Sequence, residues 1–398
     1  MTHASTLHDK AQLDALKSRL LNGLREVADF EIAEVKKPSG ECLTVILVLT
    51  GGVEREVLKT VAQLAPPSIL LAHPGHNSLP ASLEILARIR RDGGEGRILF
   101  GDAASIVPEL QLELVLASAW KRLRFSRIGL IGEPSEWLVA SDVDSAFLRG
   151  RLAVDLITVD IKELMDHIRS ATVSRKELAT FAREAEAIMG PNPEQIREAV
   201  TVYQGLRALV DEYRLSACSV RCFDLVTDMH TTGCYALSRL NDEGIPAGCE
   251  GDLQTLFSLY IASLLSGQVA FMGNIASVDT EKQIVGMAHC MCPLSMAMHY
   301  TVYTHFESDL GIGISGTFPE GAYTMFRLGG ERLDHLFVRE GTLENSEFRN
   351  DLCRTQLRLK MEEPIDELLH SPLGNHHILM PGHHRTTIER FFSRHLRT

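Results

Sequence analysis

The sequence lacks the features that mark membrane proteins and small secreted scaffolds. None of its 398 residues belong to an apolar run of about 18 residues, the length that crosses a bilayer. The N-terminal segment 1–10 is too polar to resemble a signal peptide. The eight cysteines are spread along the chain rather than closely spaced, so reduced thiols are expected. Together these absences predict a cytoplasmic protein without a membrane partner.

Positive charge is also scarce. The chain has 40 Lys and Arg against 52 Asp and Glu, which gives a formal net charge of −12. Nucleic acid is therefore not an expected partner, because a phosphate backbone calls for a basic protein face. Hydrophobic residues at 45 % and charged residues at 23 % are typical of a globular protein. The length predicts two or three domains of about 100–150 residues each.

Four of the cysteines could be combined into a zinc cluster. They are Cys218, Cys222, Cys290 and Cys292, and their spacings match no C-x2-C pair. A cysteine is also often a small buried hydrophobic residue. The sequence therefore does not favour a structural zinc site.

Strands and helices alternate through the first two thirds of the chain. Apolar, β-branched runs predict buried strands, and apolar residues spaced three or four apart predict helices. Such alternation is typical of parallel sheets covered by helices on both faces. The predicted strands are 43–50, 68–73, 97–100, 127–131, 152–159 and 216–224, and the main predicted helices are 12–27, 53–64, 112–123, 176–189 and 193–215.

The clearest predicted helix spans 252–267, with Asp252 as N-cap and Gly267 as C-cap. After it the chain becomes rich in strand patterns and glycine turns. We therefore predict two doubly wound, Rossmann-like α/β domains, residues 1–125 and 126–267, followed by a β-rich domain, residues 268–398.

Glu250 is the strongest single candidate for chemistry, because it lies at the mouth of that helix. A carboxylate there can bind a metal ion and accept a proton. It can equally be a charge that stabilises the helix dipole. Asp252, two residues later, fits the role of a helix cap better than that of a ligand.

Histidines provide the other candidate ligands. His289 alternates with Val285 and Met287 along a predicted strand, a pattern that also fits a core histidine. Two histidine pairs come late in the chain, and imidazole is the commonest transition-metal ligand. Solvated histidines are the alternative for these pairs, which are His376–His377 and His383–His384.

Three glycines, Gly311, Gly313 and Gly316, spell the G-x-G-x-x-G pattern of a dinucleotide loop. That loop requires a helix opening at the third glycine, whereas a strand-like segment follows here. We therefore interpret them as hairpin glycines.

Several motifs together resemble the L-fucose isomerase and L-arabinose isomerase superfamily. They are LNDEGIPAGCEGD at 240–252, FMGN at 271–274, AH at 288–289, CP at 292–293 and GNHH at 374–377. The likeness covers roughly residues 216–384. It implies that the β-rich domain is barrel-like, that Mn²⁺ or another divalent cation is bound, and that subunits form trimers or hexamers with active sites between them.

The resemblance also implies roles for single residues. Glu250 matches the first carboxylate ligand and acid/base residue, and His289 and His376 match the imidazole ligands. His377 takes the place of His376 if the register slips by one residue. Asn274 stands where the family has its second carboxylate. Asn274 can offer a carbonyl oxygen to a cation, but it cannot exchange a proton with the substrate.

Isomerisation through an enediol usually needs both a base and an acid. Asp279, Glu307 or a metal-bound water could replace the missing carboxylate. We predict Asp279 as the second catalytic residue, although a bulge would be needed to bring it to the face of Asn274.

The resemblance predicts a metal-dependent aldose–ketose isomerase acting on a small sugar or sugar derivative. The alternatives are an enzyme with other enediol chemistry, such as an epimerase or a carbon–carbon bond transferase, and a non-catalytic sugar-binding protein. The sequence does not name the sugar. Substrate contacts are proposed for His76, Asn77, Trp137 and His377.

Overall fold

The computed structural model describes residues 1–37 and 42–397. The chain divides into two compact units, 1–117 and 118–398. The first unit is a parallel α/β layer, and the second contains a further parallel sheet and a β-barrel. Two parallel α/β sheets followed by a six-stranded antiparallel barrel confirm the predicted fold class. The boundaries predicted near 125 and 267 remain a prediction.

The first unit is a doubly wound sheet. Its strands are parallel and lie in the order β1-β2-β3-β4. Apolar residues of α1 and α4 pack on one face of the sheet, and those of α2 and α3 pack on the other. The elements are β1 (Thr2–His3), α1 (Lys10–Val27), β2 (Val45–Val48), α2 (Glu54–Val61), β3 (Ser68–Ala72), α3 (Ser78–Arg91), β4 (Gly96–Phe100) and α4 (Ala103–Leu123).

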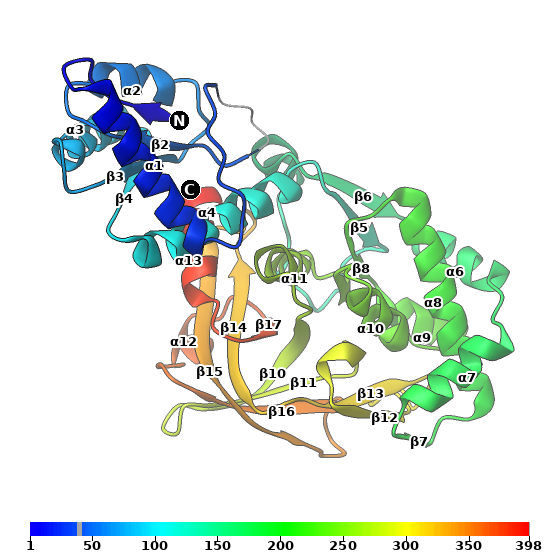
Figure 1. Ribbon diagram of the computed structural model, residues 1–398. Helices are drawn as coiled ribbons and strands as arrows, with labels where there is room; N and C mark the ends of the chain where they lie inside the picture. The colour runs from blue at the N-terminus through cyan, green and yellow to red at the C-terminus, as the bar shows by residue number, and fades with distance from the viewer. Residues whose placement is uncertain (38–41, 398) are drawn as a thin grey trace. The chain divides into compact units, whose positions relative to one another are not determined.

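The second parallel sheet has the strand order β6-β5-β8-β9. Its last strand, β9, leads directly into α11, and α11 packs between this sheet and the barrel (Figure 1). The elements are β5 (Arg127–Ile131), α5 (Ser145–Phe147), a π-helical turn (Leu148–Leu152), β6 (Asp155–Val159), α6 (Ile161–Ser170), α7 (Arg175–Glu184), α8 (Pro193–Tyr213), β8 (Ala217–Val220), α9 (Cys222–Met229), α10 (Cys234–Asp242), β9 (Ala247–Cys249) and α11 (Leu253–Ser266).

Six antiparallel strands close the barrel in the order β10-β11-β16-β15-β14-β17. Aromatic and aliphatic side chains such as Phe271, Met287 and Phe337 form its core. The strands are β10 (Phe271–Asp279), β11 (Ile284–His289), β14 (Gly321–Gly329), β15 (His335–Glu347), β16 (Thr355–Met361) and β17 (His376–Pro381), and the helices beside them are α12 (Glu367–His370) and α13 (Arg385–His395).

A small third sheet, β13-β12-β7, joins the two parts of the second unit. Its strands are β7 (Ala187–Met189), β12 (His299–Tyr303) and β13 (Gly313–Thr317), with a 3-10 turn at Leu294–Met296. The β12–β13 pair is antiparallel, so Gly313 and Gly316 lie in a strand, as expected of hairpin glycines. Two sequence predictions are wrong here. The helix predicted over 176–189 ends at Glu184, and the strand predicted over 216–224 ends at Val220, where α9 begins almost at once.

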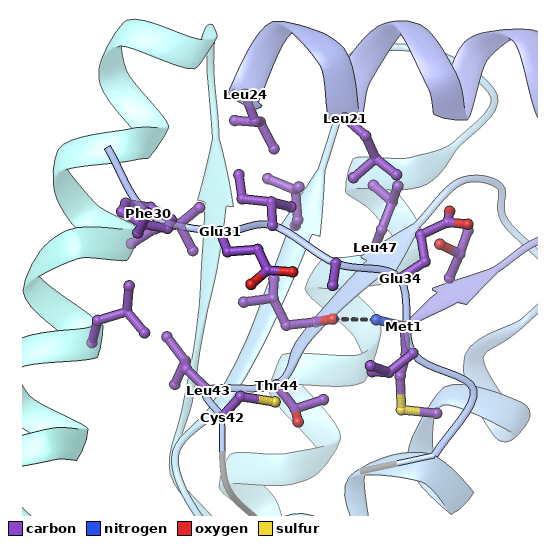
Figure 2. A pocket seen from close by; sticks show the side chains of 18 residues that line it. Met1, Leu21, Leu24, Phe30, Glu31, Glu34, Cys42, Leu43, Thr44 and Leu47 are labelled. Carbon is purple, nitrogen blue, oxygen red and sulfur yellow. Dashed lines mark hydrogen bonds between the residues drawn. The ribbon is translucent and has the colours of Figure 1, made fainter. Parts of the chain in front are cut away.

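Among the described residues, no helix is long and apolar enough to cross a membrane. A cavity of the first unit has a volume of about 330 Å³ and is lined mainly by apolar side chains such as Leu21, Leu24 and Leu47 (Figure 2). At one wall the Met1 amino group donates a 2.7 Å hydrogen bond to the Val45 carbonyl. No histidine lines this cavity in the described part of the chain, so it lacks the imidazole ligands expected of the metal site.

Candidate metal centre

Glu250 lies where the parallel sheet meets the barrel. It follows the last residue of β9 and precedes the cap of α11. Both Glu250 and Gly251 have left-handed backbone, with φ of 65° and 72°. A side chain at Gly251 would meet the Pro134 Cα at 2.7 Å, so only glycine fits this turn. The tight turn sets the direction in which the Glu250 carboxylate points.

Two side chains hold the Glu250 carboxylate. The Trp137 indole nitrogen donates a 2.6 Å hydrogen bond to Oε2, and Nε2 of His376 lies 3.7 Å from Oε1. Burial opposes ionisation of Glu250, but the contact with His376 and the hydrogen bond from Trp137 outweigh it and lower the pKa of the carboxyl. Glu250 is therefore an anion at neutral pH, as a metal ligand or a base must be.

Asp252 links the helix to the barrel. Its side chain accepts a 2.9 Å hydrogen bond from the Thr255 amide, which confirms that it caps α11. The same carboxylate lies 3.0 Å from Nδ1 of His376 and 3.3 Å from a guanidinium nitrogen of Arg327. All three side chains are fully buried. Asp252 is thus more than a cap, because it also orients a histidine.

His376 has one ring nitrogen bound and one open. Nδ1 contacts Asp252, whereas Nε2 is buried and, among the described residues, has no hydrogen-bond partner. Burial lowers the pKa of His376, but the contacts with Asp252 and Glu250 outweigh it and raise the pKa to about 9. At neutral pH the metal-free ring is therefore protonated, and a cation bound at Nε2 would displace the proton from that nitrogen. A carboxylate behind the other ring nitrogen is the usual outer support of a metal-binding histidine.

His289 ends β11 and lies beside His376, with the ring centroids 5.6 Å apart. Burial and the charge of His376 lower its pKa to about 4, so the ring is neutral. Its Nδ1 accepts a 3.1 Å hydrogen bond from the Met291 amide. The neutral ring therefore carries its proton on Nε2, and binding a cation at that nitrogen requires the proton to move.

One set of donor atoms meets the requirement for a metal site. A ligand atom each from Cys249, Glu250 and His289 lie within 4.8 Å of one another. The open Nε2 of His376 faces the same carboxylate. A divalent cation therefore fits these residues for two reasons. The donor atoms are of the kinds that bind such cations, and the buried Nε2 of His376 has no hydrogen-bond partner among the described residues. The identity of the ion is not fixed by this geometry.

Asn274 belongs to the same site. It is paired with His376 across β10 and β17, so the two side chains share a face of the barrel wall. Asn274 lines the cavity next to Glu250, but its carbonyl oxygen accepts a 2.6 Å hydrogen bond from Asn375. Asn375 therefore competes with any cation for that oxygen.

The structure does not bring Asp279 to the cavity. Strand β10 contains a bulge between Ile275 and Ser277, of the kind that would be needed to bring Asp279 to the face of Asn274. Asp279 nevertheless lies at the far end of β10, where it is half-exposed and 3.4 Å from the Lys282 ammonium. Glu307, by contrast, lines the cavity together with Glu250. Of the two carboxylates considered as replacements, Glu307 is the one near the chemistry.

The remaining sequence candidates fall in three places. Trp137 contacts Glu250 directly. His377 points into the barrel, where its ring lies edge-on to Phe337 and burial lowers its pKa to about 3. His76 and Asn77 follow β3 in the first unit, and both have positive φ. Their role in substrate binding remains a prediction.

The cavity that contains this cluster has a volume of about 50 Å³. That is room for a cation and a few ligand atoms rather than a whole hexose. Phe223 packs edge-on to Trp137, with ring centroids 4.9 Å apart, and forms part of the wall. Of the four cysteines considered for a zinc cluster, Cys222 and Cys290 line this cavity, whereas Cys218 and Cys292 do not. Their separation along the chain hid the fact that five cysteines share one cavity. They are Cys222, Cys234, Cys249, Cys290 and Cys353.

Comparison with known proteins gives distant relatives of one kind. The chain is 23 % identical over 318 residues to a protein of Alkalicoccus urumqiensis, 23 % over 296 residues to one of Priestia megaterium, and 26 % over 236 residues to one of Clostridium sp.. All three are named sulfoquinovose isomerase. The matches cover 76, 71 and 56 % of this chain and 71, 65 and 52 % of the relatives.

The chain is therefore a distant homologue of isomerases of a sugar derivative. No protein-family model matches it. The relatives' names mention neither fucose nor arabinose isomerase, so that resemblance remains a prediction.

Proposed function

We propose that this protein is a metal-assisted aldose–ketose isomerase that acts on a sulfonated sugar or a closely related sugar derivative. The observation that carries the proposal is the Glu250 carboxylate, an anion held between the Trp137 indole and the open nitrogen of His376. The relatives support the reaction type and the substrate class. Mn²⁺ is the ion that the family resemblance implies.

Glu250, His289 and His376 would hold the cation, with Asn274 at the edge of the site. A bound divalent cation would polarise the neighbouring carbonyl and hydroxyl oxygens of a sugar. Asp252 fixes the orientation of His376, and Arg327 balances the charge of Asp252.

Glu250 would remove the proton from the sugar carbon next to the carbonyl and return it to the neighbouring carbon. The hydrogen bond from Trp137 occupies Oε2, which leaves Oε1 on the side of His376. Glu307 would transfer the hydroxyl proton that must move at the same time, because it lines the same cavity. Asp279 does not line this cavity and is paired with the Lys282 ammonium, so it is not proposed for this role.

Substrate charge would be bound outside this cavity. Among the described residues that line it, none is lysine or arginine, whereas Glu250 and Glu307 are acidic. The cavity therefore has no side chain suited to bind a sulfonate, so the reacting carbons would enter first and the anionic end would face away. Contacts to the rest of the sugar are proposed to come from a neighbouring subunit of a trimer or hexamer, with His76 and Asn77 as candidates for that role.

The test is a substrate screen in deuterated water, read by NMR. Protein loaded with Mn²⁺, and in a second series with Zn²⁺, is incubated with sulfoquinovose and with unmodified aldoses, and the signal of the hydrogen next to the carbonyl is followed. We expect that signal to disappear, with a ketose accumulating, and Glu250→Gln to abolish both. Exchange without a ketose would instead indicate other enediol chemistry. Absence of exchange with every sugar would refute the proposal.

The two carboxylates are compared in the same assay. Glu307→Gln should lower the rate by about 10² to 10⁴, the usual contribution of a positioned acid or base. Asp279→Asn is the matched control, and it should leave the rate unchanged because its side chain lies outside the cavity. The reverse result would return the role to Asp279.

A further inference from the structure

Cys249 and Glu250 are neighbours in sequence, yet both face one cavity. Adjacent residues of a regular strand point to opposite faces. Here β9 ends at Cys249, and the left-handed backbone of Glu250 and Gly251 breaks the alternation. As a result the Cys249 sulfur comes within 4.8 Å of ligand atoms of Glu250 and His289.

The turn that produces this arrangement is held from outside. The Ser135 amide donates a 2.9 Å hydrogen bond to the Glu250 carbonyl, and Gly251 packs against the backbone of Glu133 and Pro134. A non-glycine residue in left-handed conformation costs about 1–2 kcal/mol, so such strain persists only where its surroundings enforce it. The turn therefore places the thiol in the site reproducibly.

A sulfur donor changes which cation the site prefers. Carboxylate, carbonyl and water ligands suit Mn²⁺, whereas thiolate suits softer ions such as Zn²⁺. Glu250, Asn274 and the two histidines alone would make an oxygen- and nitrogen-only site. Cys249 adds a ligand that the motif resemblance did not include.

We propose that Cys249 is itself a ligand of the metal centre, so that the site selects Zn²⁺-like cations over Mn²⁺. This inference rests on the proposed function, since it names the ion class of that same site. On binding, a metal–sulfur bond forms, and the thiol proton leaves to solvent. No change of oxidation state is involved.

Other cysteines of the cavity provide the control. Cys234 opens α10 and is buried in the same cavity wall, but it is not part of the donor set. A Cys234→Ser variant therefore removes a thiol from the cavity without touching the proposed ligands. Cys290 is less suitable because it follows His289 directly.

Metal preference alone would not test the idea, because almost any site binds Zn²⁺ more tightly than Mn²⁺. The first measurement is X-ray absorption of the wild-type protein with one equivalent of Zn²⁺. We expect one sulfur neighbour at about 2.3 Å, with the other neighbours nitrogen or oxygen. This experiment needs no variant, so it stands even if substitutions at Cys249 impair folding.

The second measurement uses Co²⁺ as a probe, because thiolate coordination gives an intense charge-transfer absorption in the near ultraviolet. Wild type and Cys234→Ser should have this band, and Cys249→Ser should lack it. After equilibration with equal Zn²⁺ and Mn²⁺, the bound Zn²⁺ to Mn²⁺ ratio should fall at least about tenfold in Cys249→Ser, as expected for loss of a metal contact.

Two negative outcomes are distinguishable. If wild type binds one Zn²⁺ or Co²⁺ with nitrogen and oxygen neighbours only, the role of Cys249 is refuted and the proposed isomerase site stands. If wild type binds none of the three cations, the proposed function fails together with this inference.

Discussion

Replacing Asp252 by asparagine should destabilise the second unit far more than loss of a helix cap would. Asparagine caps a helix about as well as aspartate, so the cap itself survives the change. The charge does not survive, and Arg327 would be left fully buried without its carboxylate partner. Removing one member of a buried ion pair costs about 3–5 kcal/mol. We expect a loss of that size at neutral pH, where the lowered pKa keeps Asp252 ionised.

Urea denaturation followed by tryptophan fluorescence measures this loss, because both tryptophans, Trp120 and Trp137, lie in the second unit. The matched control is Asp160→Asn, since Asp160 caps α6 from an exposed position and forms no ion pair with another described residue. That control should change stability by less than about 0.5 kcal/mol. If Asp252→Asn costs no more than Asp160→Asn, the ion pair does not stabilise this unit. Metal affinity should also fall by about 10- to 100-fold in Asp252→Asn, because the carboxylate no longer orients the ligand histidine.

Three further predictions follow from the site. Trp137→Phe should slow isomerisation about 10- to 100-fold, since a hydrogen bond to a charged group contributes about 1.5–3 kcal/mol. The control is Trp120→Phe, and equal rates in the two variants would contradict the role of the Trp137 indole. Gly251→Ala should unfold at a lower urea concentration than Gly267→Ala, although both glycines have left-handed backbone. The Cβ added at Gly251 would meet backbone at 2.7 Å, whereas the Cβ added at Gly267 would point into open space. Similar urea midpoints for the two variants would contradict this prediction. Despite burial, carboxylate contacts raise the pKa of His376 from 6.5 to about 9. The protonated ring should therefore add roughly 3 kcal/mol to the free energy of unfolding of the metal-free protein below about pH 6.5, and this contribution should be lost as the pH rises through 9. If His376→Gln shows the same fall in stability over that range, His376 is not its source.

The alternation of strands and helices was enough to predict both parallel sheets and the change to antiparallel strands after α11. The prediction failed where pairing between strands far apart in the sequence determined the structure. Residues 187–189 continue the apolar spacing of α7, yet they form β7 because Ala187 pairs with Thr301, more than a hundred residues later. A local pattern contains no information about such a partner.

Residues of the candidate site could be predicted where a motif coincides with a helix cap. They were harder to predict where the direction of the backbone determines which way a side chain points. Glu250 and His376 were named from the sequence, and the structure brings them to 3.7 Å from each other. Cys249 was not predicted as a ligand, because strand alternation predicts that it faces away from Glu250, whereas both line one cavity. Glu307 was considered but not chosen over Asp279, since the path of the loop after β12 cannot be derived from spacing.

The place of β17 in the barrel has a consequence for biosynthesis. β17 is the last barrel strand to leave the ribosome, but it lies between β10 and β14, which are made earlier. His376 is its first residue, so this proposed ligand cannot meet Glu250 until β17 has inserted and the ring is complete. A nascent chain that already contains Glu250 would therefore still lack His376, and the proposed metal site would be completed only after translation of the barrel has finished.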